Sequence, residues 1–120
     1  MKFYQCKDCG SIVILGEPNV CCINGWEEML PNTTDAAGEK HVPVIDTDGK
    51  AVTVKVGSVE HPMLAAHYIM WIVLETNQGY QKKELKPGEK PVAQFALAEG
   101  ETAVAAYEYC NLHGFWKADA

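Results

Sequence analysis

The first 30 residues contain four of the chain's five cysteines and very few residues that could build a core. One short apolar run, Ile12 to Leu15, is followed by the turn signal Gly16-Glu17-Pro18-Asn19. A segment of about 30 residues buries too little apolar surface to fold alone and normally needs a cross-link or a bound metal. We therefore expect a structural metal in this segment.

The spacing of these cysteines favours coordination by sulfur. Cys6 and Cys9 enclose two residues and Gly10 follows, an arrangement in which a tight turn points two thiolates at one metal. The second pair, Cys21 and Cys22, is adjacent, which should distort a tetrahedral four-sulfur site of the kind that suits zinc or iron. Two alternatives stay open: a redox-active Cys-x-x-Cys pair, and reduced cysteines that bind nothing. Iron would make the site an electron-transfer centre, and zinc would make it purely structural.

The composition indicates a folded, acidic protein. Hydrophobic residues make up 48% and charged residues 22% of the chain, as in globular proteins. The net charge of −6 offers nothing to a nucleic-acid backbone. Cys6 and Cys9 stand where a secretory signal needs apolar residues, and the longest apolar run, Tyr68 to Leu74, is too short to span a bilayer. We expect a cytoplasmic protein, whose clustered cysteines bind metal because a reducing compartment disfavours disulfides.

Beyond a polar, turn-rich stretch from Pro31 to Gly38, the pattern is that of an all-β unit. Val52, Val54 and Val56 alternate with polar residues, which is the period of a half-buried strand. Turn signals separate further runs rich in β-branched and aromatic residues, which predict strands over 67–76, 80–85, 92–97 and 102–109. The segment Thr102 to Glu108 contains three alanines and can also be read as a helix. The short, regular spacing favours an antiparallel sandwich or barrel.

All four histidines and the fifth cysteine lie in this second unit. Cys110 and His113 enclose two residues and precede a glycine, a spacing that suits a loop wrapped around one metal. Taken singly, a histidine beside a strand is more often a surface or core residue than a ligand. A shared site is favoured because His61 and His67 flank predicted strands, where loops gather, and because a Cys/His pair needs further ligands.

Glu39 and Lys40 directly precede His41, just after the polar stretch. Charge alone favours a solvated ion pair, since both residue types usually stay exposed. Tyr68, Trp71 and Trp116 are interpreted as core residues rather than as contacts to a cofactor.

Together these motifs resemble the desulfoferrodoxin family, the two-iron form of superoxide reductase. The cysteine segment with its Cys21-Cys22 doublet is similar to the family's desulforedoxin-type module. The second unit is similar to the family's catalytic domain in five segments that occur in the right order: Glu39-Lys40-His41-Val42-Pro43-Val44, Val56-Gly57-Ser58-Val59, His61-Pro62-Met63, His67-Tyr68-Ile69 and Cys110-Asn111-Leu112-His113-Gly114. The resemblance covers essentially the whole chain, and no family ligand is missing.

The resemblance implies two domains and two iron ions. Residues 1–32 would form a desulforedoxin-like module, and residues 33–120 a neelaredoxin-like catalytic domain with an immunoglobulin-like sandwich fold. The first iron, centre I, would have four thiolate ligands: Cys6, Cys9, Cys21 and Cys22. The second iron, centre II, would have four imidazoles and an axial thiolate: His41, His61, His67, His113 and Cys110. In the family the sixth coordination position of the centre II iron is vacant in the ferrous state and takes a glutamate in the ferric state. The resemblance implies that this glutamate is Glu39 and that the family's neighbouring lysine is Lys40, and these are the two implied catalytic residues.

The implied activity is the one-electron reduction of superoxide to hydrogen peroxide without release of dioxygen, in defence against oxidative stress. The family also implies a homodimer and a small electron donor such as rubredoxin. Two other functions fit the cysteine pattern: a non-enzymatic, rubredoxin-like electron carrier, and a zinc-stabilised binding module. The first leaves the histidines and Cys110 without a purpose, and metal analysis separates the second.

Overall fold

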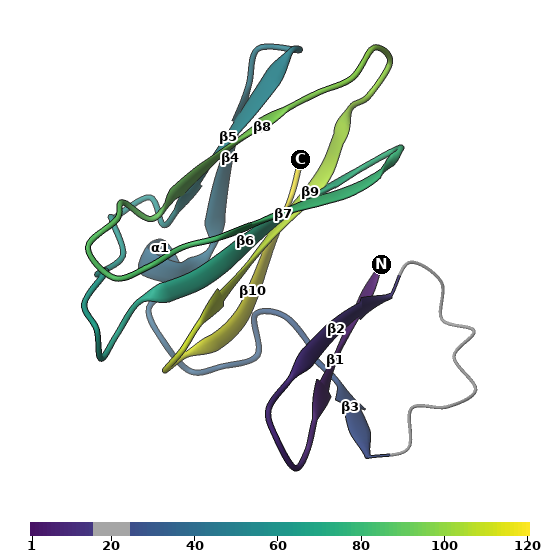
Figure 1. Cartoon of the computed structure of the whole chain (residues 1–120). Helices are drawn as coiled ribbons and strands as arrows, with labels where there is room; N and C mark the ends of the chain where they lie inside the picture. The colour runs from purple at the N-terminus through teal and green to yellow at the C-terminus, as the bar shows by residue number, and fades with distance from the viewer. Residues whose placement is uncertain (16–24) are drawn as a thin grey trace. The chain divides into compact units, whose positions relative to one another are not determined.

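The computed structural model describes residues 1–15 and 25–120 and is shown in Figure 1. The described residues form two compact units, Met1–Leu30 and Pro31–Ala120. Cys21 and Cys22 lie outside them, so the structure does not bear on the adjacent pair. In the described part of the chain, no helix has the length and apolar character that crossing a membrane requires.

The first unit is a small antiparallel sheet in the order β2-β1-β3. Its strands are β1 (Lys2–Cys6), β2 (Ile12–Leu15) and β3 (Trp26–Glu28), and the short apolar run noted above becomes β2. Phe3, at 1% exposure, is its most buried side chain among the described residues. The chain leaves β1 at Cys6 and turns back into β2 through Gly10, whose φ is +76°. That positive φ favours glycine.

The second unit is a sandwich of two antiparallel sheets, which confirms the all-β prediction. Its elements are α1 (Gly38–His41), β4 (Pro43–Thr47), β5 (Ala51–Val56), β6 (Ile69–Thr76), β7 (Gly79–Glu84), β8 (Val92–Ala96), β9 (Ala103–Cys110) and β10 (Gly114–Asp119). One sheet has the order β10-β9-β6-β7 and the other β4-β5-β8. Figure 1 shows the two sheets as separate layers.

The core lies between these two sheets and follows the period of two that the sequence predicts. Val52, Val54 and Val56 on β5 are at most 1% exposed and pack against Ile72 and Leu74 of β6 in one cluster. Burial of each such side chain contributes about 1.5–3 kcal/mol relative to leaving it in water. The buried face of β9 extends this cluster to Cys110, so the core runs directly into a predicted ligand.

The alanine-rich segment Thr102 to Glu108 lies in β9 from Ala103 onward, which confirms the predicted strand and not the helix that its alanines also allow. β9 pairs on one side with β6 and on the other with β10, in register over most of its length. Small alanines suit a central strand, since Ala105 and Ala106 are at most 1% exposed and leave room for larger neighbours. Tertiary pairing here overrides the helix preference of alanine.

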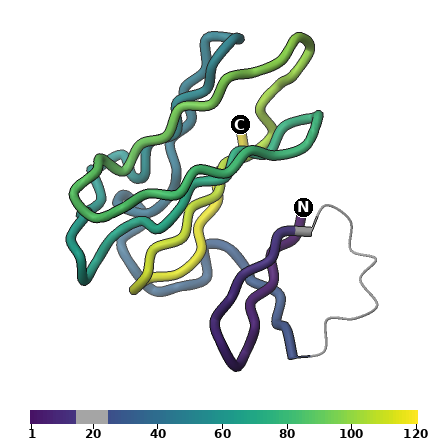
Figure 2. The backbone as a smooth tube through the Cα atoms, in the orientation of Figure 1, coloured from purple at the N-terminus to yellow at the C-terminus, as the bar shows by residue number. Residues whose placement is uncertain are grey.

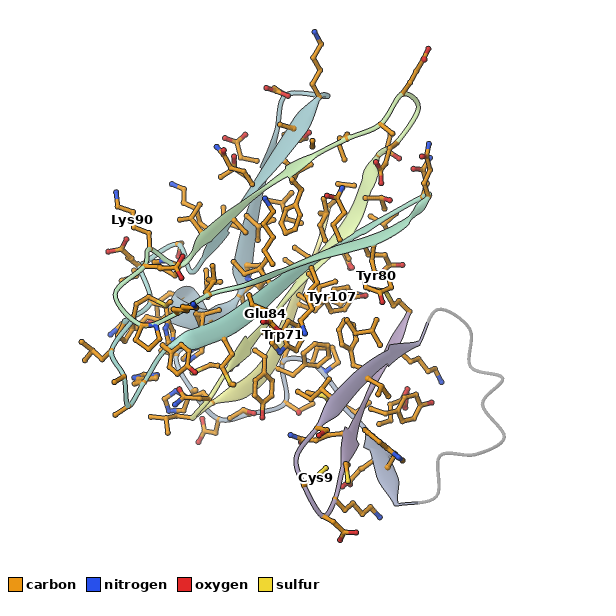
Figure 3. The ribbon with its side chains drawn as sticks, viewed as in Figure 1. Cys9, Trp71, Tyr80, Glu84, Lys90 and Tyr107 are labelled. Carbon is orange, nitrogen blue, oxygen red and sulfur yellow. The ribbon has the colours of Figure 1, made fainter. Side chains whose placement is uncertain are left out.

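The opposite face of the four-stranded sheet is covered by aromatic rings. Trp71 stacks on Tyr109 at 5.8 Å between centroids, and Tyr107 stacks on Phe115 at 5.6 Å. Figure 3 labels Trp71 and Tyr107 on this sheet. The central strands β6 and β9 are therefore packed on both faces, which holds their ends in fixed positions.

In the second unit, the edge strands β4 and β10 and the helical turn α1 were not predicted; the three strands of the first unit were not predicted either. β4 and β10 are each paired on one side only, and polar residues such as Asp46 and Lys117 interrupt their apolar pattern. Tertiary pairing with β5 and β9 makes them strands. The polar stretch before α1 is a loop, as predicted. Asn32 fixes this loop to β10 through hydrogen bonds to the backbone N–H and carbonyl of Lys117.

The backbone trace in Figure 2 shows how this topology gathers distant segments. The α1 turn, the loop between β5 and β6 and the turn between β9 and β10 lie at the same end of the sandwich. These are the three segments that contain the four histidines and Cys110.

Candidate metal centre

His41 ends the single turn α1 and is only 2% exposed. The turn is closed by the Val42 N–H, which donates to the Gly38 carbonyl at 2.9 Å. The Nδ1 atom of His41 lies 2.7 Å from the Ala37 carbonyl oxygen. A carbonyl can only accept, so Nδ1 must carry the proton, and Nε2 of the neutral ring presents a lone pair.

His61 repeats this arrangement on the loop after β5. It is 2% exposed, and its Nδ1 lies 2.7 Å from the Pro62 carbonyl oxygen. Its Nε2 lies 3.2 Å from Nε2 of His41. By the same reasoning both Nε2 atoms present lone pairs, and two lone pairs at this distance repel each other unless a proton or a metal ion lies between or beside them.

His67 stands in a tight loop before β6. Its backbone N–H and carbonyl both bond to Leu64, at 3.0 and 2.9 Å. Its Nε2 is buried and has no hydrogen-bond partner among the described residues. A buried polar atom without a partner is costly, and a bound cation removes that cost.

Cys110 and His113 enter from the turn between β9 and β10. Cys110 is fully buried, with Sγ at 3.5 Å from Nε2 of His61 and 4.0 Å from Nδ1 of His113. Trp116 contacts two of the histidines. Its Nε1 donates to the His113 carbonyl at 3.0 Å, and its ring stacks on that of His41 with 4.9 Å between centroids. The interpretation of Trp116 as a core residue is correct for its burial but missed these contacts.

The structure thus brings five predicted ligands together: His41, His61, His67, Cys110 and His113. One donor atom from each lies within 4.8 Å of all the others. The imidazoles form a closed ring of four neighbours with centroid distances of 4.7, 4.6, 5.0 and 4.9 Å and interplanar angles of 74° to 85°. Imidazole nitrogens with one thiolate suit iron, zinc or copper rather than magnesium or calcium.

The electrostatics of the cluster prepare the imidazoles for a metal. Burial lowers the pKa of His41 and His67, and lowers the pKa of His61 to about 4. These three rings are therefore neutral near pH 7, as ligands must be. Burial raises the pKa of the Cys110 thiol. Hydrogen bonds from the backbone N–H groups of Leu112 and His113 lower this pKa but only partly offset the effect of burial. A bound cation favours the thiolate, so the residues fit a transition-metal ion.

Glu39 and Lys40 lie on α1 beside the cluster, and both are exposed. None of the ion pairs among the described residues involves either of them, so they do not form the solvated pair that charge alone predicted. The Lys40 ammonium adds to the burial effect that lowers the pKa of His41 and of His67. It is therefore close enough to both rings to act on an anion beside them.

A turn after β5 holds the backbone of Glu39 in place. The Val59 N–H donates to the Glu39 carbonyl at 2.9 Å, and the Ser58 hydroxyl donates to the same oxygen at 3.3 Å. Gly57 has a φ of +85°, and a Cβ placed there would lie 2.8 Å from the Glu39 carbonyl oxygen and 2.3 Å from that of Val59. Only glycine allows the two segments to approach so closely.

The first unit places two of the predicted centre I ligands near each other. Cys6 and Cys9 stand in the turn after β1, where the Cys9 N–H lies 3.4 Å from Sγ of Cys6. The Ser11 hydroxyl, 3.2 Å from Sγ of Cys9, is the largest cause of a lowered Cys9 pKa. Figure 3 shows Cys9 at the loop that joins β1 to β2. Backbone and hydroxyl donors aimed at sulfur favour the thiolate form that metals bind.

Comparison with known proteins agrees with this geometry. The model of the desulfoferrodoxin family matches residues 33–119. The chain belongs to the desulfoferrodoxin family. It is 46% identical over 123 residues to a desulfoferrodoxin from Nitratidesulfovibrio vulgaris, covering 99% of this chain and 96% of that protein.

Solved structures in the comparison are superoxide reductases. The crystal structure of the superoxide reductase from Treponema pallidum has a TM-score of 0.79 and 41% identity, and the match covers 92% of this chain and 93% of that one. A superoxide reductase described as 1Fe-SOR, from Giardia intestinalis, has a TM-score of 0.59 and 34% identity, and covers 68% of this chain and 97% of its own. The family and the His/Cys cluster together indicate iron.

Sequence reasoning missed the groups that orient the ligands. The Ala37 and Pro62 carbonyls fix the tautomers of two histidines, but every residue carries a carbonyl, so no sequence pattern marks them. Trp116 carried no signal beyond its size.

The Gly57 contact predicts a position-specific loss of stability. Gly57→Ala should lower the free energy of unfolding by about 2–3 kcal/mol more than Gly49→Ala, because the added methyl meets backbone atoms. Gly49 is a matched control, since its φ is +89° and a Cβ there meets nothing within 4 Å. Urea unfolding measures both, and an equal loss for the two variants would contradict the tight contact with Glu39.

Proposed function

We propose that this chain is a superoxide reductase, which converts superoxide, one electron and two protons into hydrogen peroxide. The observation that carries the proposal is the closed ring of four imidazoles with one buried cysteine, five donor atoms within 4.8 Å, in a chain of the desulfoferrodoxin family. Its relatives with solved structures are described as superoxide reductases.

We further propose that centre II is an iron held by five side chains: His41, His61, His67, His113 and Cys110. When bound in the ferrous state, this iron supplies the electron and an open coordination position for a small oxidant. The Ala37 and Pro62 carbonyls keep the Nε2 atoms of two ligands free of protons. Burial keeps bulk water from the cysteine side of the site, because Cys110 has no exposed surface.

Lys40 attracts the substrate in this proposal. Superoxide is an anion, and the protein has a net charge of −6, so the overall field opposes its approach. Lys40 is exposed and lies near enough to His41 and His67 to affect their pKa values. A cation there reverses the local field where the substrate must enter.

Glu39 is the second charged residue with a role in this proposal. Its side chain is exposed on α1, two residues from His41, and its carbonyl is fixed by the turn at Ser58 and Val59. A carboxylate is a hard ligand that prefers the ferric state over the ferrous state. We propose that Glu39 would be the additional residue to hold the iron in its ferric state.

The first unit holds centre I in this proposal. Its iron would be bound by Cys6, Cys9, Cys21 and Cys22. The turn that brings Cys6 and Cys9 near each other supports the first half of the site. We propose residues 1–32 as the desulforedoxin-like module and 33–120 as the catalytic domain, supported by the division after Leu30 and the family match from residue 33.

The cycle needs a returning electron, and we propose a small carrier such as rubredoxin as the donor. We also propose a homodimer, which would help a short first unit to bury its apolar residues. Five cysteines in metal-binding roles fit a reducing compartment, so we place the reaction in the cytoplasm.

The product balance tests the proposed reaction. A reduced, iron-loaded sample mixed with a pulse of superoxide should form hydrogen peroxide without stoichiometric dioxygen. A dismutase would release both, and a zinc-stabilised module would release neither above the uncatalysed background. Metal analysis and a visible spectrum of the same sample identify iron. Formation of both products would refute the reductase reaction.

Lys40→Ala should slow the second-order reaction with superoxide by roughly 3–10-fold and weaken its dependence on salt. Lys50→Ala is a matched control, since Lys50 is an exposed lysine in the turn at the far end of β4 and its loss changes the net charge equally. Pulse radiolysis at several ionic strengths measures both. Equal slowing by the two variants would mean that only net charge matters.

Cys110→Ser should remove the thiolate charge-transfer absorption of centre II and prevent peroxide formation, because serine does not supply a thiolate. Cys9→Ser should instead change the absorption of centre I. Visible spectra of the oxidised variants separate the two centres. Survival of the centre II absorption in Cys110→Ser would remove Cys110 from the ligand set.

A further inference from the structure

Asn111 stands in the turn between two of the cluster residues, Cys110 and His113, and makes three hydrogen bonds to another segment. Its backbone N–H donates to the Tyr68 carbonyl at 3.2 Å. Its side-chain Oδ1 accepts from the Tyr68 N–H at 2.9 Å, and its Nδ2 donates to the Ala66 carbonyl at 3.1 Å. The side chain therefore forms hydrogen bonds to the backbone on both sides of His67.

These bonds connect segments that the strands themselves do not join. The ladder between β6 and β9 begins at Ile69 opposite Cys110, with an irregularity directly after it. His67 lies before that ladder, and its own backbone bonds to Leu64 within the same loop. Among the described residues, the hydrogen bonds that join the loop Leu64–Tyr68 to the Cys110–His113 turn are those of Asn111.

The bonded segments contribute three of the five donor atoms. His67 belongs to the loop, while Cys110 and His113 belong to the turn that Asn111 occupies. The contact between the His67 and His113 rings, at 5.0 Å, is the widest in the ring of four and spans this junction. Any movement of the loop away from the turn would open the ring there.

We propose that Asn111 is a positioning residue that fixes His67 against the Cys110–His113 turn and thereby sets the spacing of the donor atoms. The inference rests on the proposed metal site and deepens it. Asn111 acts through backbone atoms that flank a ligand, and its amide does not contact the donor atoms. It belongs with the groups that orient ligands, whose loss typically weakens metal binding by 10–100-fold.

The chain contains a chemically matched control at the other end of the same two strands. Asn77 follows β6, and its backbone N–H donates to the Thr102 carbonyl at 3.1 Å. Its Oδ1 accepts from the Thr102 N–H at 2.9 Å, and its Nδ2 donates to the Gly100 carbonyl at 3.0 Å. The three bonds have the same pattern as those of Asn111, and both asparagines are exposed. The Asn77 clamp flanks no metal-ligand candidate.

The experiment compares Asn111→Ala with Asn77→Ala in the full chain. Each variant loses two exposed side-chain hydrogen bonds, so the metal-free proteins should unfold at similar urea concentrations. After loading with ferrous iron and oxidation, release of centre II iron to a chelator is followed by the decay of the Cys110 thiolate absorption. We expect release from Asn111→Ala to be about 10-fold faster than from wild type, and release from Asn77→Ala to match wild type.

Equal release rates in the two alanine variants would overturn the positioning role. Should Asn111→Ala not fold, Asn111→Asp and Asn77→Asp replace the pair, because aspartate keeps the Oδ1 acceptor and loses only the Nδ2 donor. In that pair, faster release from Asn111→Asp alone supports the role, and equal rates overturn it. If wild type itself shows no thiolate absorption after loading, the proposed metal site fails instead, which separates the two conclusions.

Discussion

The pairing of β6 with β9 is the interaction on which the rest of the sandwich depends. These central strands join the two edge strands of their sheet, pack on the core with one face and carry stacked aromatic rings on the other. Their register places Ile69 opposite Cys110. That single alignment brings the loop before β6 and the turn after β9 to the same end of the sandwich, so the positions of His67, Cys110 and His113 follow from this strand pairing.

Three features of the cluster are energetically unfavourable without a cation. Two imidazoles have their protons fixed on Nδ1 by carbonyl oxygens and face each other with lone pairs at 3.2 Å, and a third has a buried nitrogen with no partner in the described residues. Burial also opposes ionisation of the cysteine. Each of these costs disappears when a metal ion binds, which couples metal affinity to the folded arrangement. Exposed residues of both charges, Glu39 and Lys40, remain on the accessible side.

Much of the fold could be predicted because a buried strand has a recognisable local sequence pattern, with alternating apolar residues and turn residues at its ends. Alternation of valines marked β5, and turn residues marked the ends of β6, β7 and β8. The edge strands β4 and β10 were missed because polar residues such as Asp46 and Lys117 break their apolar pattern; edge position alone is not the reason, since β7 and β8 are edge strands too and were predicted. For Thr102 to Glu108 the alanines allowed a helix, and pairing on both sides decided for a strand. The strand predicted for that segment is confirmed, whereas β4 and β10 were missed because long-range hydrogen bonds, absent from any local window, set their backbone.

By itself the sequence determined which candidate donors are present: four histidines and a cysteine in one unit, four cysteines in the other, and the spacing of Cys110 and His113. Side-chain chemistry and short-range spacing are properties of the chain whether or not it is folded. Only the tertiary structure decided which nitrogen His41 and His61 offer, that these two rings come within 3.2 Å, and that Asn111 ties the loop around His67 to the turn. These depend on carbonyl and amide groups that every residue shares, and packing alone selects which of them meet.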